Sequence, residues 1–517
     1  MKSPPLTLLA ATLAVAGCAS GSNPQAGSDD EGGLIPQVPV PAAEGPKLVA
    51  LVHHTVVRDR PSASGKAIGH LRAGGRVARA AEPYSRKGCP GGWYPVRPRG
   101  FVCAGVEAST DLDAPIARVL AAEPSLERAL PYRYGQVVGT TAVAYTELPS
   151  AAEQQAAEPE LAKRKPGEPE PLGLGANDVP LTDAGLPKGP PILLPDAEGV
   201  GADGRRTTES FFAFPAPAAP APPLADGFSL LPKGTAAPAP GRQVLRRGST
   251  VAIAGALEHR TRRFGVLPDG RLVPTDQLRP LVGTSWHGID LAETGLPVAF
   301  ALREGVRPRS FKGNKAEVLD DEYEPREAIP LTGRFRTVDS IRYFCTRDER
   351  WLRAKDIILI PKRNKFPEWV AGGQKWLDIS LANQTLTAFV GTKPVYATLI
   401  SSGADRLGDP AAGPATVQGV FRVRGKHLTR DVDEREVQQA FSVFEAPWAL
   451  DFADGFSITG SYWRSRFGEA QGYHNVSLAP IDAHWLWTWT ELQLPEGWHG
   501  VVVDEQGAET TIVYTHK

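Results

Sequence analysis

The chain lacks an excess of charge of either sign. Its 517 residues include 57 lysines and arginines against 58 aspartates and glutamates, which gives a formal net charge of −1. Nucleic-acid binding needs clustered cations that neutralise phosphates, and a chain balanced in this way offers no broad surface of that kind. We therefore expect no nucleic-acid partner, and a chain of this length is expected to fold as several modules.

The N-terminal apolar run is too short to cross a bilayer. The stretch LTLLAATLAVAG falls far below the roughly 20 residues of a membrane helix, so residues 1–18 are interpreted as a signal peptide. The run ends VAGC, which resembles the bacterial lipobox and implies lipidation of Cys18 and a membrane anchor. The alternative is an ordinary signal peptide with a chance cysteine. Because Ala19 follows rather than aspartate, we expect the outer membrane, facing the periplasm.

Cysteine is scarce, and the three remaining residues each have an interpretation. Cys89 and Cys103 lie at the two ends of KGCPGGWYPVRPRGFVC, where a turn between two strands would bring them together. In an oxidising compartment we expect a disulfide, the alternative being two unpaired buried thiols. Cys345 has no histidine nearby and no CxxC spacing, so we expect a buried structural cysteine.

Glycine and proline are abundant, with 53 and 48 residues, and they divide the chain. Residues 19–46 are rich in Gly, Ser, Pro and acidic residues and indicate a flexible tether. Residues 47–110 contain short β-rich runs between Gly and Pro residues, which predict a small barrel. The runs VVRDRPSASGKAIGHLRAGGRV, GWYPV and GFVC resemble a bacterial SH3-like domain, a module found on cell-wall proteins.

The middle of the chain is less clearly patterned. Residues 111–149 contain a helical stretch, IARVLAAEPSLERAL, and a strand-like run, TTAVAYTELP, and we assign them to part of a β module. Residues 150–242 are rich in Pro and Ala and indicate an insertion or linker, which could be an extended spacer. Residues 243–285 form a β-rich module with a Pro-Asp-Gly hairpin signal, and residues 286–365 have the spacing of another SH3-like module.

Residues 366–512 are expected to form a mainly β C-terminal domain. KWLDISLANQTLTAFVGTKPVYATLISSG predicts strands around a Gly-Thr-Lys turn, and TVQGVFRVRGKH predicts a further strand. The runs WLDISLANQTLTA and TVQGVF resemble the L,D-transpeptidase (YkuD-like) catalytic domain. The expected fold class is therefore mainly β and multidomain, with SH3-like small barrels followed by an L,D-transpeptidase-like β-sandwich that carries a short helix.

The family chemistry needs a cysteine nucleophile and a histidine base, which act on peptidoglycan stem peptides without a cofactor. The family carries them in an I-H-G-x-Y-W strand and an S-H-G-C-V-N/R-L loop. ITGSYW and GYHNVSL align with these motifs without a gap, which places Thr459 at the base position and Asn475 at the nucleophile position. Neither side chain can perform the family role near neutral pH. The expected substrate groove comprises Tyr462, Trp463, Tyr473 and Ser477.

Several nearby residues suggest other chemistry. His474 is a candidate base, but a polar loop residue or ligand contact is the preferred interpretation, because no nucleophile stands beside it. Ser461 or Ser477 could be proposed as a nucleophile, although spacing alone does not give an activated Ser-His pair. His474, Asp482 and His484 form a loose cluster that suggests a metal. Because two residues that are two apart on a helix point in different directions, we expect ordinary surface residues and no metal.

A helix is expected directly after these motifs. Pro480 suits a first helical turn, and Ile481, Trp485 and Trp489 are spaced to share one face. The tryptophans are expected in the core, and an aromatic groove for glycan or peptide is the alternative. This set comprises Trp463, Trp485, Trp487 and Trp489.

Three functions remain open. The preferred one is a cell-wall lipoprotein whose degenerate transpeptidase domain binds peptidoglycan stem peptides or another wall enzyme. The second is an active L,D-transpeptidase with a non-standard catalytic arrangement, which makes cross-links or attaches proteins to the wall. The third is an assembly surface with no affinity for peptidoglycan. Substitution at both catalytic positions favours the first.

Overall fold

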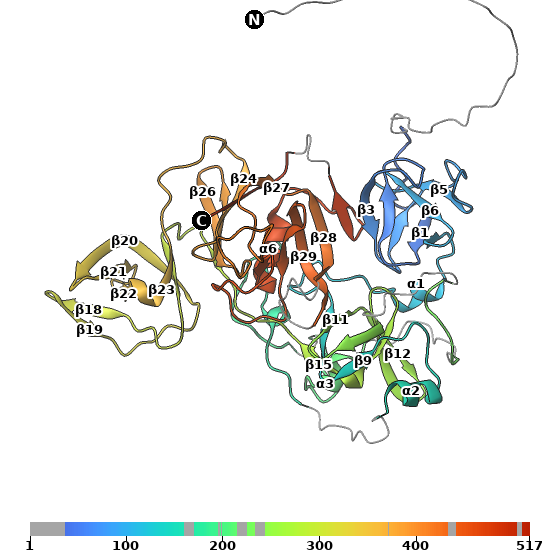
Figure 1. Ribbon diagram of the computed structural model, residues 1–517, viewed down its shortest axis with the longest axis horizontal. Coiled ribbons are helices and arrows are strands. Elements are labelled where there is room, and N and C mark those ends of the chain that lie inside the picture. The colour runs from blue at the N-terminus through green and yellow to red at the C-terminus, as the bar shows by residue number, and fades with distance from the viewer. Residues whose placement is uncertain are drawn as a thin grey trace, which may run out of the picture. The chain divides into compact units, whose positions relative to one another are not determined.

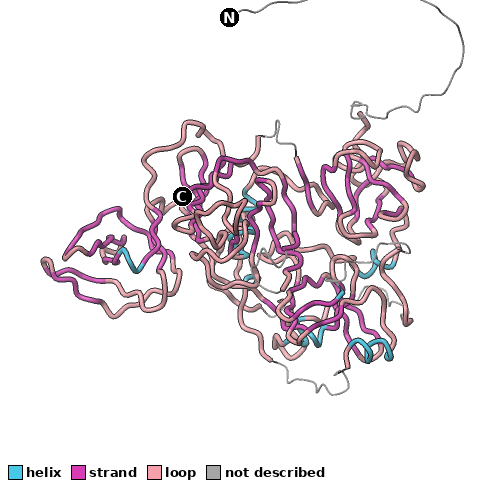
Figure 2. The backbone as a smooth tube through the Cα atoms, in the orientation of Figure 1, coloured by secondary structure: helices cyan, strands magenta, loops and turns pink. Residues whose placement is uncertain are grey.

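The computed structural model describes residues 37–159, 170–194, 197, 199–214, 225–232, 243–370, 372–432, 441–503 and 509–517. Strands dominate the described chain and its helices are short, which confirms the mainly β fold class (Figures 1 and 2). Cys18 and the expected signal peptide lie outside the described residues. No helix within the described ranges is both long enough and apolar enough to span a membrane.

The first β module packs two small sheets around one core. One sheet has the order β4-β1-β7, and the other strands run in the order β3-β2-β6-β5. Their bounds are Lys47–Ala50 (β1), Thr55–Arg58 (β2), Ala67–Leu71 (β3), Arg76–Ala78 (β4), Gly92–Pro95 (β5), Phe101–Ala104 (β6) and Ala108–Ser109 (β7). Buried side chains from both sheets, such as Leu48, Val57 and Val102, share the core. The expected small barrel of residues 47–110 stays a prediction.

A disulfide joins Cys89 to Cys103, with a Cα–Cα distance of 5.9 Å. Cys103 lies in β6, opposite Trp93 of β5. Cys89 is buried and packs with Trp93 and Phe101. The structure therefore contains the pairing that the sequence predicts.

Replacing both cysteines by alanine is expected to lower the free energy of unfolding of this module by about 3 kcal/mol. The bridge closes a loop with a sequence separation of 14, and opening that loop returns conformational entropy to the unfolded chain. Calorimetry of the Cys89→Ala/Cys103→Ala variant measures the loss, and reducing the parent with dithiothreitol should reproduce it. An unchanged melting transition in both samples would contradict the expectation.

Residues 111–149 and 243–285 contribute to one β module. β8 (Arg133–Val137) lies between β11 (Thr250–Ile253) and β15 (Leu278–Leu281), and β9 (Thr141–Val143) pairs with β10 (Val244–Arg246). A neighbouring sheet contains β12 (Gly255–His259), β13 (Arg262–Val266) and β14 (Leu272–Pro274). The β13–β14 hairpin contains the predicted turn, where Gly270 has φ +84°. The β9–β10 pair brings Val143 and Val244, which lie on either side of residues 150–242, next to each other.

The helical stretch expected within residues 111–149 is shorter than the sequence suggests. Only α1 (Pro115–Val119) forms, and the chain is irregular from Leu120 onward. Pro124 follows shortly, and proline both lacks a backbone donor and disfavours helix at the residue before it. The local sequence therefore stops the helix despite the apolar spacing.

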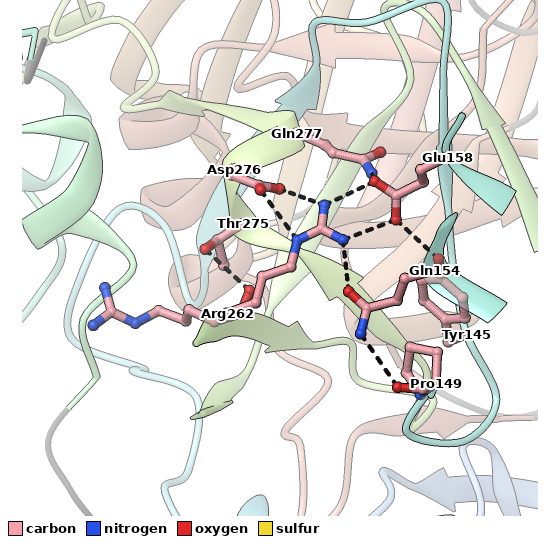
Figure 3. Close-up of polar contacts among 9 residues, drawn as sticks. Tyr145, Pro149, Gln154, Glu158, Arg262, Thr275, Asp276 and Gln277 are labelled. Atoms are coloured by element: carbon pink, nitrogen blue, oxygen red, sulfur yellow. Dashed lines mark hydrogen bonds and ion pairs between the residues drawn. The ribbon is translucent and has the colours of Figure 1, made fainter. Parts of the chain in front are cut away.

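The described parts of the insertion pack against the sheet strands. They contain α2 (Ala151–Ala157), the 3-10 helix η2 (Ala176–Asp178) and α3 (Thr208–Phe211). Figure 3 shows that Glu158, directly after α2, accepts hydrogen bonds from Arg262 of β13 at 2.8 and 2.9 Å and from Tyr145 at 2.8 Å. Arg262 also pairs with Asp276. This network fixes α2 to β13 and to η3 (Thr275–Gln277).

The third β module is a seven-stranded sheet with the order β19-β18-β22-β21-β20-β17-β23. Its strands are β17 (Val298–Ala301), β18 (Arg309–Lys312), β19 (Lys315–Val318), β20 (Ala328–Val338), β21 (Ile341–Thr346), β22 (Trp351–Arg353) and β23 (Ile357–Ile360). Cys345 lies in β21 and is buried and free, as expected.

The C-terminal region packs two sheets around a shared core. The first has the order β16-β26-β25-β24-β33-β27. Its strands are β16 (Ile289–Asp290), β24 (Lys375–Ser380), β25 (Thr385–Val390), β26 (Lys393–Leu399), β27 (Gly419–Arg422) and β33 (Ile512–His516). The sequence places β16 in the preceding module, but it pairs with β26 here.

The second C-terminal sheet carries the segment of interest. Its strands are β28 (Gly425–Val432), β29 (Val443–Ala453), β30 (Phe456–Gly460), β31 (Val476–Leu478) and β32 (Gly500–Val502). The core between the two sheets also receives helix α6 (Pro480–Trp489). Buried members from both sheets and the helix include Leu377, Leu386, Trp448, Ile458 and Leu486.

This second sheet continues into two of the earlier modules, with the order β15-β8-β11-β29-β28-β32-β3-β2-β6-β5. β11 meets β29 through Thr250 and Val443, and β3 meets β32 through the pairs Gly69–Val501 and His70–Gly500. A Cβ on Gly69 would collide with Trp498, and one on Gly500 would collide with His70 and His427. Glycine is therefore required for the close approach of β3 to β32.

Five histidines gather where β3 meets β32. Ring centroids are 4.0 Å apart for His53 and His54, 4.5 Å for His54 and His70, and 5.4 Å for His70 and His427. The fifth ring, that of His499, lies 5.6 Å from His70. We call these five residues the histidine cluster, and it joins side chains of the first module to those of the C-terminal region.

Glu445 of β29 is the buried carboxylate beside this cluster. It is 5% exposed, its Oε1 lies 3.0 Å from His53 Nε2, and its Oε2 lies 3.8 Å from His499 Nε2 and accepts from Thr429. Burial raises the pKa of Glu445, but the two histidines outweigh that effect and hold the pKa well below its usual range. Tyr134 of β8 donates to the Glu445 carbonyl at 3.0 Å, so one residue links three modules.

Candidate functional site

The two sequence motifs lie side by side on adjacent parallel strands. β30 carries Thr459 and β31 carries Ser477, and these two residues face each other across the strand pair. Asn475 directly precedes β31, and α6 begins two residues after that strand ends. Ser401, which follows β26, in turn lies opposite Ser477. The predicted nucleophile and base positions therefore lie within one small area of the sheet.

Asn475 occupies this area as a buried structural side chain. It is 5% exposed, and its Oδ1 accepts hydrogen bonds from the backbone N and the hydroxyl of Ser457, both at 2.9 Å. The Ser457 hydroxyl also accepts from Arg430 at 2.6 Å. The amide thus links the start of β31 to β30 and β28.

Thr459 is 1% exposed, and the hydroxyls near it lie on the same face of the sheet. Residues paired across strands share a face, so Thr459, Ser477 and Ser401 form a row, and Ser461 lies two residues beyond Thr459. The hydroxyls of Ser401 and Ser461 are buried and have no hydrogen-bond partner among the described residues. Ser461 is therefore not activated by any described histidine.

His474 is held in the loop next to Asn475 by the segment 410–414. Its Nε2 lies 3.1 Å from the carbonyl oxygens of both Pro410 and Gly413. Because carbonyl oxygens only accept hydrogen bonds, Nε2 carries the proton and donates. His474 has φ +61°, a left-handed conformation that glycine adopts more readily than other residues. The structure thus places His474 as a polar loop residue.

These contacts limit the chemistry that the site can perform. An asparagine amide cannot form the thiolate that attacks a peptide bond, and a threonine hydroxyl cannot accept its proton near neutral pH. Nε2 of His474 donates to two carbonyls, which leaves Nδ1 as the acceptor, and no described hydroxyl or thiol is hydrogen-bonded to it. The arrangement therefore provides hydrogen bonds but no activated nucleophile among the described residues.

Two of the four predicted groove residues, Tyr462 and Ser477, are buried. Tyr462 is 2% exposed, stacks on Tyr134 at a centroid distance of 3.8 Å and lies 2.7 Å from the Thr250 hydroxyl. Tyr462 cannot line a groove, because the β module of residues 111–149 and 243–285 covers it. Ser477 is also buried, whereas Trp463 and Tyr473 remain partly exposed.

Helix α6 begins at Pro480 as predicted, and Trp485 stacks on Trp489 at 5.5 Å. Trp485 and Trp487 are buried, so they belong to the core rather than to an aromatic groove.

The expectation that Asp482 and His484 are ordinary surface residues is wrong. Asp482 is buried and accepts hydrogen bonds from Gly288 N at 2.8 Å, from Tyr396 at 2.7 Å and from Thr398. Burial raises its pKa despite these donors. His484 is also buried, and its Nε2 lies 2.8 Å from the Leu126 carbonyl. The side chains do point in different directions, and segments that precede the C-terminal region cover both.

No group of three or more His, Cys, Asp or Glu side chains is placed to hold a metal ion in the described part of the chain. His474, Asp482 and His484 therefore do not form a described ligand set.

Sequence reasoning missed two contributors to the site. Tyr134 and Thr250, which cover Tyr462, come from a module far away in the chain, and no local pattern marks them.

No described protein family matches the chain, and no curated protein matches it. Several solved structures are similar over part of it. An L,D-transpeptidase from Xylanimonas cellulosilytica is 18% identical over 30% of this chain, with a TM-score of 0.21. The catalytic domain of an E. faecium L,D-transpeptidase is 18% identical over 28% of this chain and 98% of its own length, with a TM-score of 0.20. An L,D-transpeptidase from Mycobacterium smegmatis is 14% identical over 43% of this chain and 92% of its own, with a TM-score of 0.22. The chain spans 65% of the Xylanimonas protein, slightly less than two thirds of it.

Proposed function

We propose that the chain is a cell-wall-associated lipoprotein whose C-terminal region has an L,D-transpeptidase-like architecture without its chemistry. In this proposal Cys18 carries the lipid anchor, the protein faces the periplasm from the outer membrane, and the C-terminal region binds peptidoglycan stem peptides or a wall enzyme. The observation that carries the proposal is the buried Asn475 at the nucleophile position, hydrogen-bonded through Oδ1 to Ser457.

The local contacts support a binding role over a catalytic one. Acyl transfer needs a nucleophile, a base that takes its proton and donors for the oxyanion. Thr459 stands at the base position and is buried, and the printed contacts of the His474 ring go to backbone carbonyls rather than to a described hydroxyl or thiol. The site keeps hydrogen-bonding groups and partly exposed aromatic rings, which suit recognition of a peptide without cleavage.

An active enzyme with another arrangement has less support. It would require a serine beside a histidine, and the Ser461 hydroxyl has no partner among the described residues. We therefore place turnover below binding as the function of this region.

Co-sedimentation of the full chain, purified in detergent, with isolated sacculi tests the binding role. We expect the protein to pellet with intact sacculi and to stay in the supernatant with sacculi from which an amidase has removed the stem peptides. The second sample separates stem-peptide binding from glycan binding by the small barrels. Equal amounts in the pellet with and without intact sacculi would contradict binding to peptidoglycan.

A further inference from the structure

The histidine cluster lies across the contact between the first β module and the C-terminal region. Three of its members, His53, His54 and His70, come from the first module. His427 lies in β28 and His499 directly precedes β32, so these two come from the C-terminal region. The His70 ring stacks on His427 at 5.4 Å and lies 5.6 Å from His499. A positive charge on His70 would therefore act directly across this contact.

The backbone part of this contact is short. β3 pairs with β32 through two residue pairs, and the His499 N–H donates to the His70 carbonyl at 2.8 Å. Trp498 packs into the core of the first module and donates from Nε1 to the Arg97 carbonyl at 2.9 Å. We call these contacts the β3–β32 junction. Neither its backbone bonds nor its apolar packing titrates between pH 7 and pH 5, so the histidine rings determine how its strength depends on pH.

Two of these rings are poorly placed to hold a positive charge. Nε2 of His70 and Nδ1 of His499 are buried and have no hydrogen-bond partner among the described residues. A charge on either ring would therefore be only partly solvated. Burial, followed by the neighbouring histidines, lowers the pKa of His70 well below its usual value. Burial also lowers the pKa of His499 to about 4, and it outweighs the carboxylate of Glu445, which lies 3.8 Å away.

The other titratable groups around the cluster act in different ways. The Glu445 carboxylate lies 3.0 Å from His53 and favours the charged form of that ring, so this pair opposes opening as the pH falls. Asp451 Oδ2 lies 3.0 Å from His427 Nε2. His54 is exposed, and solvent weakens its contribution. The remaining charged groups that act on members of the cluster or on Asp451 are Arg72, Asp269, Arg424, Arg430 and Asp431.

We propose that the β3–β32 junction is an acid-sensitive switch, in which protonation of His70 and His499 favours an open state where β3 has left β32 and the modules on either side remain folded. In the open state both rings reach water, so each can take a proton. Opening also withdraws Trp498 from the first core, and this cost keeps the junction closed at neutral pH. The switch involves contacts within the chain alone, so it does not depend on what the C-terminal region binds.

The linkage between protonation and opening gives the size of the effect. A histidine whose pKa is lowered in the closed state favours closure fully above the ordinary value of 6.5 and loses this effect as the pH falls below it. Between pH 7 and pH 5, each of the two histidines can raise the opening constant by about 20-fold. The His53–Glu445 pair cancels part of this increase. We therefore expect the opening constant to rise by about 10- to 100-fold.

Hydrogen exchange of the full chain in detergent, measured by mass spectrometry at pH 7 and pH 5 and at several low urea concentrations, tests the proposal. The reporter is the His499 amide, which donates to the His70 carbonyl, and the reference is Leu386 in β25 of the C-terminal core. After correction for the intrinsic pH dependence of exchange, protection of His499 should fall by about 10- to 100-fold at pH 5. It should also be weaker than that of Leu386 and change little with urea, because opening the junction exposes little surface.

Two results with the parent chain would overturn the proposal. One is equal protection of His499 at pH 7 and pH 5. The other is the same protection and the same urea dependence for His499 and Leu386 at pH 5, since both amides would then exchange through unfolding of the whole region.

A matched pair of variants tests the assignment to the cluster. His70→Gln removes one titrating ring from the junction, so the loss of His499 protection between pH 7 and pH 5 should be at least about fivefold smaller than in the parent. His287→Gln is the control, because His287 lies outside the cluster and its Nδ1 contacts only the neighbouring Gly288 carbonyl among its described contacts. This control should show the full parental loss. A full parental loss in folded His70→Gln would overturn the assignment, and the two results with the parent chain remain decisive if that variant does not fold.

Discussion

Replacing Glu445 by alanine is expected to lower the free energy of unfolding by about 3–5 kcal/mol, because it leaves buried groups without their anionic partner. The Glu445 carboxylate lies 3.0 Å from His53 Nε2 and also accepts from Thr429. Burial lowers the pKa of His53, but the facing carboxylate outweighs burial and leaves that pKa raised. Removing the carboxylate therefore removes what stabilises a buried imidazolium.

The backbone of Glu445 also makes contacts that a substitution at this position can disturb. It has φ +61°, donates its backbone N–H to Asp431 at 3.1 Å and accepts from Tyr134 through its carbonyl.

The shift of the urea midpoint of Glu445→Ala measures the loss of stability. Hydrogen exchange at His70 and Val501 reports whether β3 separates from β32. Glu445→Gln is the control, since it keeps the volume and loses only the charge. A decrease in the free energy of unfolding of less than about 1 kcal/mol for Glu445→Ala would contradict the role assigned to the Glu445–His53 pair.

Acidification from pH 7 to pH 5 is expected to lower the free energy of unfolding by roughly 3 kcal/mol. Burial and then the neighbouring histidines lower the pKa of His70 well below its usual value, and burial lowers the pKa of His499 to about 4. These imidazoles are neutral in the folded state at pH 5 but protonated in the unfolded state. Stability is therefore lost as the pH falls through the ordinary histidine value of 6.5.

Other groups that face the cluster act in different ways. The raised pKa of His53 stabilises the folded state as the pH falls, which offsets part of the loss. The lowered pKa of Glu445 contributes stability that is lost only below the ordinary glutamate range, outside this window. Burial, followed by His53, lowers the pKa of His54 to about 3. Because the His54 side chain is exposed, solvent weakens the effect of this shift on stability, and the expected loss comes from His70 and His499.

Urea titrations at half-unit pH steps measure this dependence. Removing one titrating group with His70→Gln should reduce the slope between pH 6.5 and pH 5, even if that variant is less stable at every pH. An unchanged slope in His70→Gln, or a parent whose stability does not change between pH 7 and pH 5, would contradict the assignment to the histidine cluster.

Local patterns predicted much of the fold. The Pro-Asp-Gly turn between β13 and β14 and Pro480 at the start of α6 are determined by residues close in sequence. The links between modules were not predictable, because the β3–β32 junction depends on two residue pairs that are more than 400 positions apart. The same cause explains the error over Asp482, whose partners Gly288, Tyr396 and Thr398 come from distant segments.

The sequence predicted which residues of the two motifs lie near each other, but not which of their side chains are buried. The gap-free alignment of the two motifs placed Thr459 and Asn475 near each other, and the strand pair β30–β31 brings them together. It could not reveal that Tyr134 covers Tyr462, or that Pro410 and Gly413 hold His474 Nε2. These contacts leave the site without an activated nucleophile among the described residues.

We propose that this region performs no acyl transfer, and intact-mass spectrometry tests this directly. The full chain is incubated with a tetrapeptide muropeptide, and both the protein mass and the soluble products are followed. We expect an unchanged protein mass and no cross-linked product or released terminal residue. A covalent adduct on the protein, or any turnover that a heat-denatured sample does not show, would contradict it.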